Sequence, residues 1–133
     1  MTNNEKFEYW LDTAQYDLET AEAMLDSKRW LYVVFMCQQA IEKLVKGLYV
    51  LYIDDNVPRT HNITVLIEKM EHLLPKKMTE ENYDLIEELT IYYIKGRYTD
   101  YKRKLSASLK ESDAGAIYKK AKVMFEWLLT LKP

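Results

Sequence analysis

Residues 30–52, WLYVVFMCQQAIEKLVKGLYVLY, constrain the fold of this chain more than any other segment. Their apolar and small side chains recur at alternating intervals of four and three positions, at Trp30, Val34, Cys37, Ile41, Leu44, Leu48 and Leu51. This spacing places all of them along one side of an α-helix, the side that packs against other helices. The segment therefore predicts a long helix at the centre of a helical protein.

Glycine and proline are scarce in the remaining sequence, with three of each in 133 residues, which favours few and long helices. Helical spacing of apolar residues continues in four further segments: 4–26, 60–74, 79–96 and 113–131. The length suits one domain with a core of its own. We therefore expect a single all-α domain over residues 1–133, an antiparallel up-and-down bundle of four long helices plus one shorter helix.

Short polar segments predict where these helices begin and end. Residues 26–29 form a connection so short that the first two helices must be antiparallel neighbours. The expected N-caps are Thr60 or Asn62 for the third helix, Thr79 for the fourth and Asp113 for the last. Gly96 is a natural end for the fourth helix, and we expect a polar loop over residues 106–113.

The overall charge and the termini exclude several classes of protein. A net charge of −2 argues against a protein that coats nucleic acid or an anionic membrane, so any basic site must be local. No apolar run reaches the roughly 18 residues of a membrane span, and the N-terminus lacks a signal-peptide pattern. The single cysteine, Cys37, is expected to be a buried apolar residue, which fits a reducing compartment. We expect a cytoplasmic protein without membrane contact.

Five polar residues interrupt the middle of the central helix: Gln38, Gln39, Glu42, Lys43 and Lys46. Glu42 precedes Lys46 by four positions, the order that favours an ion pair on a helix. A central helix with this many polar groups is either solvated along one edge or holds a site. We expect these residues to form one wall of a groove.

A carboxylate, Asp17, also lies at the edge of the apolar side of the first helix. It is either solvated or paired with a cation, because a carboxylate in such a place needs a compensating partner. The candidate partners are Lys43, Lys46 and Arg97. We favour Arg97, because a carboxylate would hold its guanidinium group in place for binding phosphate, and Asp17 and Arg97 would then form the opposite wall.

Residues 95–104, KGRYTDYKRK, hold five cations, two tyrosines and one acid. One interpretation is a solvated connection whose tyrosines pack against the ends of the bundle. The other is a surface on which Arg97 binds phosphate through its fork of donors, while Tyr98 or Tyr101 stacks on a base.

Four groups of residues follow one another along the chain: Trp10, Ala14, Asp17 and Leu18; Gln38, Gln39, Ala40, Glu42, Lys43, Lys46 and Gly47; Pro58, Thr60, His61 and Leu66; and Gly96, Arg97 and Tyr98. Together they resemble the HEPN domain (higher eukaryotes and prokaryotes nucleotide-binding) over essentially the whole chain. The resemblance implies a helical bundle, usually dimeric, that is often encoded beside a minimal nucleotidyltransferase in toxin–antitoxin modules. It points to a nucleotide- or phosphate-binding site that comprises Asp17, Lys43, Lys46, Arg97, Tyr98 and Tyr101.

Many proteins of the wider superfamily are metal-independent endoribonucleases in which a histidine follows an arginine by four to six residues. No histidine follows Arg97 here, and both histidines, His61 and His72, precede it. Cleavage of RNA without metal needs a group that can both accept and donate a proton near neutral pH, and imidazole suits this best. The spacing therefore argues against ribonuclease activity. No Cys or His partner lies at metal-ligand spacing from His61, so we expect no metal.

We therefore expect a homodimeric module that binds a nucleotide or RNA, works with a minimal nucleotidyltransferase and needs no cofactor. Two alternatives remain open, an endoribonuclease toxin that uses Arg97 and a structural adaptor without a ligand. A nucleotidyltransferase partner could also transfer a nucleotide to the hydroxyl group of Tyr101 or Tyr98.

Overall fold

A computed structural model describes residues 1–97 and 99–133, with residues 99–102 described by their backbone alone. All regular elements in these residues are helices: α1 (Asn3–Asp26), α2 (Trp30–Tyr52), α3 (Ile63–Met70), the short 3-10 helix η1 (Glu71–Leu73), α4 (Glu80–Lys95), α5 (Thr99–Ser108) and α6 (Glu111–Leu129). The predicted all-α class is confirmed, and α1, α2, α4 and α6 are the four long helices.

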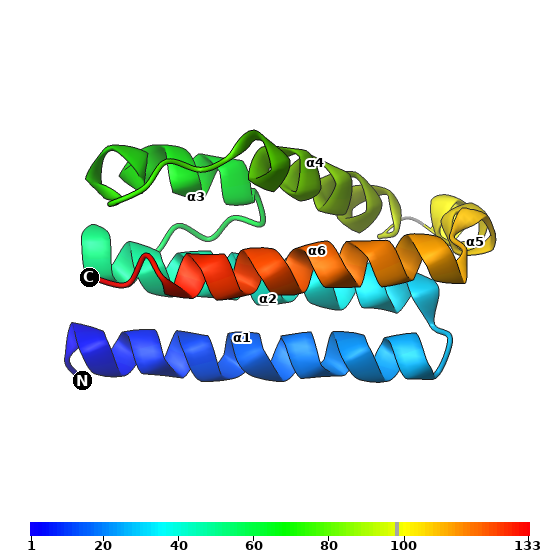
Figure 1. Cartoon of the computed structure of the whole chain (residues 1–133), viewed down its shortest axis with the longest axis horizontal. Helices are drawn as coiled ribbons and strands as arrows, with labels where there is room; N and C mark the ends of the chain where they lie inside the picture. The colour runs from blue at the N-terminus through cyan, green and yellow to red at the C-terminus, as the bar shows by residue number, and fades with distance from the viewer. Residues whose placement is uncertain (98) are drawn as a thin grey trace.

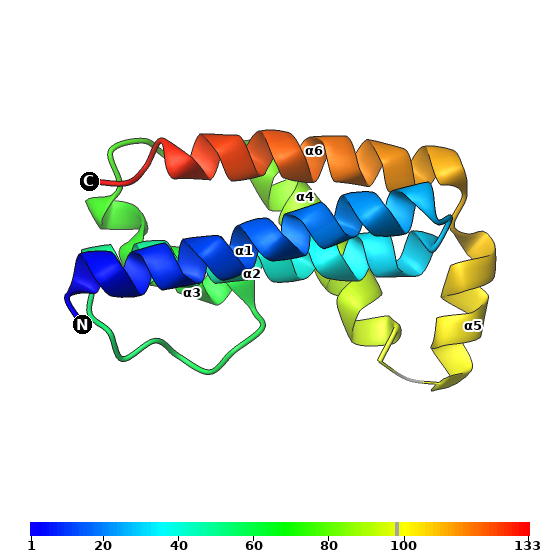
Figure 2. The same cartoon turned by 90° about the horizontal axis from the view of Figure 1, so that it is seen from below.

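α2 lies at the centre of the bundle and contacts every other α-helix (Figure 1). α1 runs antiparallel to α2 on one side, α3 and α4 lie on the opposite side, and α6 covers a third side. α5 lies across the end of the bundle where α1 turns into α2 (Figure 2). Both chain termini lie at the other end.

The predicted apolar side of α2 is the core of the protein. Five of its residues are completely buried: Val34, Cys37, Ile41, Leu44 and Leu48. Burial of a leucine or isoleucine side chain stabilises a fold by roughly 1.5–3 kcal/mol, so this row alone is a major contribution. Burial also raises the pKa of the Cys37 thiol to about 12, which agrees with its expected role as an apolar core residue.

Most helix ends follow the capping pattern of the sequence. The side chain of Asn62 accepts a hydrogen bond from the backbone N–H of Val65 at 3.2 Å, and Thr79 caps α4 in the same way. α4 ends at Gly96, as expected, although with an ordinary φ of −68° rather than a left-handed conformation.

The predicted loop over residues 106–113 is wrong. α5 extends to Ser108, and α6 begins at Glu111, so Asp113 lies inside the first turn of α6 rather than capping it. The carboxylate of Asp113 instead accepts a hydrogen bond from the backbone N–H of Lys110 at 3.0 Å. Leu109 is buried between the two helices and anchors this connection, a tertiary contact that the polar composition of the segment obscured.

No helix in the described residues is both long enough and apolar enough to cross a membrane.

Candidate functional site

The polar residues in the middle of α2 contact several neighbouring elements. Lys43 contacts α1, whereas Gln38, Gln39 and Glu42 contact the start of α3 or α4. The two sets of contacts are continuous, because Lys46 pairs with Glu42 and also lies 6.0 Å from the centre of the Trp10 ring on α1. Positions 38, 39, 42, 43 and 46 share one side of the helix, and their role as one wall of a groove stays a prediction.

Asp17 pairs with Lys43, and the Oδ2 and Nζ atoms are 2.6 Å apart. The contact is an ion pair rather than a well-aligned hydrogen bond. The favoured partner, Arg97, is therefore wrong. α1 and α2 are antiparallel neighbours along their length, which brings Asp17 to Lys43, while Arg97 follows α4 on the far side of α2.

Glu42 is the most deeply buried charged residue of α2, with 3% of its side chain exposed. Its Oε2 atom accepts a hydrogen bond from Nζ of Lys46 at 3.1 Å, which confirms the ion pair expected from their spacing. Lys46 is itself largely buried and lies 6.0 Å from the centre of the Trp10 ring. Lys43 and Lys46 are thus both paired with carboxylates inside the bundle.

His61, in the turn before α3, contacts the same carboxylate. Its Nδ1 atom is 3.0 Å from Oε1 of Glu42, and 51% of its side chain is exposed. An ionised carboxylate can only accept hydrogen bonds, so Nδ1 donates and Nε2 is left as the nitrogen available to another molecule. The backbone carbonyl of His61 accepts from Nε2 of Gln38 at 3.1 Å, which fixes the turn against α2.

The ring of Tyr93 on α4 connects His61 to Arg97. The centre of the His61 ring lies 5.3 Å from the centre of the Tyr93 ring. The guanidinium carbon of Arg97 lies 5.6 Å from the centre of the same Tyr93 ring. Gln39 donates a hydrogen bond to the Tyr93 hydroxyl oxygen at 3.0 Å and so orients the ring. We call Gln39, Glu42, His61, Tyr93 and Arg97 the polar cluster.

The polar cluster combines a guanidinium group, an imidazole and an aromatic ring at one surface. Arg97 and His61 are exposed, and no carboxylate in the described part of the chain pairs with Arg97. Its donors are therefore available to an anion, and a guanidinium fork matches the geometry of phosphate. In the part of the chain that the structure describes, no group of three His, Cys, Asp or Glu side chains is placed to hold a metal ion.

The polar cluster reaches the surface at Arg97 and His61, which are both exposed. Grooves of about 400 to 670 Å³ run between α4 and α6 and between α1 and α6, and no residue of the cluster lines them. Small-molecule sites are usually concave, whereas an extended strand binds to a surface with charged and aromatic groups. The cluster therefore suits part of a longer ligand.

Of the four predicted site residues whose side chains the structure describes, Arg97 lies in the polar cluster, and Lys46 pairs with Glu42 of the cluster. Tyr98 and the side chain of Tyr101 lie outside the described residues, so their stacking role stays a prediction. No signal in the sequence assigned His61 or Tyr93 to the phosphate-binding site. The motif that contains His61 was the signal that could have identified His61 as a site residue. A histidine just before a helix start, together with the polar residues of α2, suggests a shared site.

No curated protein and no solved structure matches this chain. A family model, that of the HEPN domain, matches residues 7–131. This region includes every helix that contributes to the polar cluster and nearly all of the bundle. Because the match covers almost the entire sequence, the chain belongs to the HEPN domain family.

Proposed function

We propose that this protein binds RNA or a nucleotide at the polar cluster, as one component of a two-protein module with a minimal nucleotidyltransferase. Membership of the HEPN family supports a nucleotide- or RNA-binding or ribonuclease-type domain. The observation that carries the proposal is the guanidinium group of Arg97, which has no acidic partner in the described residues and lies against the ring of Tyr93.

This arrangement favours a nucleic-acid ligand for two physical reasons. Arg97 offers several parallel donors to a phosphate group, and hydrogen bonds to charged groups contribute roughly 1.5–3 kcal/mol each. The Tyr93 and His61 rings lie beside it at 5.3 Å from each other and provide aromatic surface at the same place. A phosphate on Arg97 would place its nucleoside close to these rings.

Removal of the Arg97 side chain is expected to weaken binding of RNA by about tenfold or more, which corresponds to about 1.4 kcal/mol. The measurement is fluorescence anisotropy with a labelled single-stranded RNA, in parallel with a labelled ATP analogue, for wild type and Arg97→Ala. Lys122→Ala is the matched control, because it removes one positive charge from the exposed surface of α6. Equal affinity of the two variants, or no saturable binding by wild type, would contradict the proposal.

The nucleotidyltransferase partner is supported by the resemblance of the sequence motifs, and it is tested separately. Co-expression with a nucleotidyltransferase encoded next to this chain should give a complex that co-purifies. Transfer of a nucleotide to Tyr101 or Tyr98 would add the mass of one nucleotide to the protein, and the Tyr→Phe variant at the modified position would abolish it. A partner that neither binds nor modifies the chain would refute this part of the proposal.

A second candidate function, metal-independent RNA cleavage, is favoured by the contact of His61 with Glu42. The sequence argued against it because no histidine follows Arg97, but the fold brings His61 to the same Tyr93 ring. Nε2 of His61 could accept the proton of a ribose 2′-OH, whose oxygen would attack phosphorus as the bond to the 5′ oxygen breaks. Water would protonate the leaving oxygen, and Arg97 would stabilise the charge on the phosphate.

If the protein cleaves RNA, His61→Ala should lower the rate by about 100-fold or more, the size expected for loss of a general base. The assay is cleavage of structured RNA in the presence of a chelator. His61→Ala should retain most of the RNA affinity, whereas Arg97→Ala should lose both affinity and cleavage. His72→Ala is the matched control, since His72 is exposed on η1, outside the polar cluster. Absence of cleavage by wild type would leave binding as the function.

A further inference from the structure

His61 has one ring nitrogen bound to a buried carboxylate and the other without a partner in the described part of the chain. Its Nδ1 atom lies 3.0 Å from Oε1 and 3.2 Å from Oε2 of Glu42. The Glu42 side chain is 3% exposed, whereas that of His61 is 51% exposed. The ring also lies against Tyr93, with the two planes inclined at 54°. The ring is thus held on two sides, and Nε2 is the nitrogen left to bind another molecule.

The turn that carries His61 is fixed through its backbone as well. The side chain of Gln38, which is completely buried, donates a hydrogen bond to the backbone carbonyl of His61 at 3.1 Å. The hydroxyl oxygen of Thr60 accepts from the backbone N–H of Asn62 at 3.0 Å. Because these contacts do not involve the imidazole ring, the turn stays in place whether or not the ring carries an extra proton.

A proton on Nε2 determines what His61 can bind. In the neutral ring, Nδ1 donates to the ionised carboxylate of Glu42, so Nε2 is an acceptor and cannot bond to a phosphate oxygen, which is also an acceptor. Protonation turns Nε2 into a positively charged donor, while Nδ1 keeps its bond to Glu42. Imidazole groups in proteins change charge between about pH 5 and about pH 8. Acidification therefore converts His61 into a group that binds phosphate.

The charged and titratable groups around His61 belong to α2 and to the α4 side of the bundle. On α2, Nζ of Lys46 lies 3.1 Å from Oε2 of Glu42, so Lys46 already balances the charge of this carboxylate. On the α4 side are the Tyr93 ring and Arg97, whose guanidinium carbon lies 5.6 Å from the centre of that ring. A proton on His61 thus adds net positive charge beside Arg97. A bound phosphate relieves the repulsion between these two cations, so phosphate binding and protonation favour each other.

We propose that protonated His61 is a second phosphate-binding group of the polar cluster, so that the protein binds RNA more tightly as the pH falls. This inference rests on the proposed function and adds to it. Arg97 supplies a permanent positive charge and His61 a pH-dependent one, both against the Tyr93 ring. Since the protonated ring is the form that binds, affinity rises as the pH falls through the range in which the imidazole gains its proton. Glu42 is a positioning residue, because it holds Nδ1 and leaves Nε2 to the ligand.

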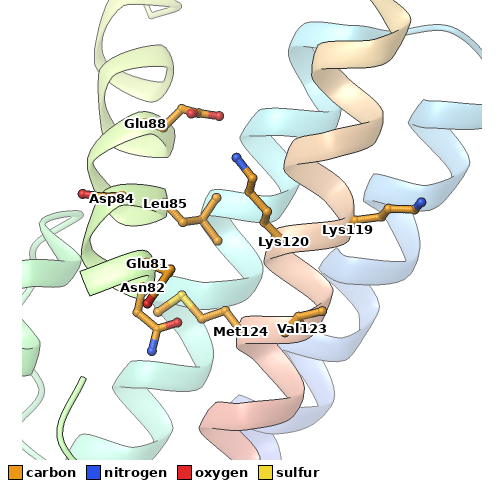
Figure 3. Close-up of a pocket in the computed structure, with 9 residues that line it drawn as sticks. All are labelled: Glu81, Asn82, Asp84, Leu85, Glu88, Lys119, Lys120, Val123 and Met124. Carbon is orange, nitrogen blue, oxygen red and sulfur yellow. The ribbon is translucent and has the colours of Figure 1, made fainter. Parts of the chain in front are cut away.

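Another pair of lysines lies in surroundings that do not suit phosphate. Lys119 and Lys120 of α6 line a groove whose α4 side carries Glu81, Asp84 and Glu88 (Figure 3). Carboxylates on the facing helix repel an anion there, and no imidazole lines this groove. Removal of a lysine from the groove therefore tests whether a loss of positive charge anywhere on the surface has the same effect as a loss at the polar cluster.

The pH dependence of RNA binding tests the proposal. Fluorescence anisotropy compares wild type with His61→Gln and His61→Ala at about pH 8 and about pH 5.5, on either side of the usual imidazole range. The probe is an oligouridylate without a terminal phosphate and with a dye that does not titrate, because a terminal phosphate would itself titrate near pH 6. Wild type should bind about tenfold more tightly at the lower pH, the effect of one charged hydrogen bond. Both His61 variants should lose this gain.

Salt dependence provides a second measurement of the same contact. Each phosphate contact with a single strand changes the slope of log K against log salt concentration by about 0.7. The slope for wild type should therefore be steeper by about this amount at the lower pH, whereas the slope for His61→Gln should be the same at both. A merely structural role of His61 would leave the wild-type slope independent of pH.

Two control variants lie outside the polar cluster. His72→Ala removes the other imidazole, Lys120→Ala removes a cation from the groove of Figure 3, and both should keep the full pH response of wild type. Far-UV circular dichroism at both pH values shows whether each protein stays folded. An equal pH response in wild type and both His61 variants, or no response in a wild type that binds through Arg97, would overturn the inference and leave the proposed function standing. Absence of saturable RNA binding at both pH values would overturn both.

Discussion

Replacement of Glu42 with alanine is expected to lower the free energy of unfolding by about 3–5 kcal/mol, the typical cost of breaking a buried ion pair. The Glu42 side chain is 3% exposed and that of its partner Lys46 is 11% exposed. Without the carboxylate, the ammonium group of Lys46 would remain inside the bundle with no charge to compensate it. The loss is measured by urea unfolding followed by far-UV circular dichroism.

Two comparisons show whether burial of the pair causes this effect. Glu8→Ala breaks the exposed ion pair with Lys132, in which both side chains are at least 40% exposed, and should cost at most about 1 kcal/mol. The double variant Glu42→Leu/Lys46→Met removes both charges and should recover most of the stability, because apolar residues of similar size often replace a buried pair without loss. If Glu42→Ala proved no more costly than Glu8→Ala, the pair would contribute little to the fold.

Substitution of Gly96 by alanine is expected to destabilise the protein by about 1–3 kcal/mol through overpacking. An added Cβ atom would lie 2.6 Å from Cε1 of Phe35 and 2.9 Å from the carbonyl oxygen of Tyr92. Phe35 cannot move freely, because its ring packs edge-on against Tyr93 at 5.9 Å. We therefore expect the same substitution to shift Tyr93 and to weaken RNA binding at the polar cluster. Thermal unfolding and the anisotropy assay measure the two effects.

Gly115 offers the matched control. It lies within α6, and a Cβ added there would have no neighbouring atom within 4 Å. Gly115→Ala should therefore raise stability by about 0.5–1 kcal/mol, because alanine favours the helix and nothing is displaced. If Gly96→Ala lowers the free energy of unfolding and Gly115→Ala raises it, close packing against Phe35 is the reason for glycine at position 96. Stabilisation by both would show that the Phe35 ring moves away at no cost.

Much of the fold could be predicted because its signals are local. The alternation of four and three along residues 30–52 determines which side of α2 is buried, whatever packs against it. Asn62 and Thr79 cap their helices through contacts with residues only three positions away. α5 was missed because its sequence is strongly polar, and Leu109, which follows it, is buried only in the assembled bundle.

The candidate site could be predicted only in part. Arg97 was found from the sequence because a cluster of cations and tyrosines is visible in composition and in the family motif. The predicted partner of Asp17 was wrong, because the choice among three cations depends on how α1 and α4 pack against α2. His61 was missed for the same reason, because it precedes Arg97 by more than thirty residues and reaches the same Tyr93 ring only in the folded chain.

By itself, the sequence determined that this protein is a helical bundle built on α2, because helix periodicity and capping depend on residues a few positions apart. Only the tertiary structure decided what the polar residues of α2 do. It directed Lys43 toward α1 and Glu42 toward His61, and it joined His61, Tyr93 and Arg97 at one surface. The physical reason is that ion pairs and ring contacts form between side chains that share a place in space, and the packing of helices around α2 sets that place.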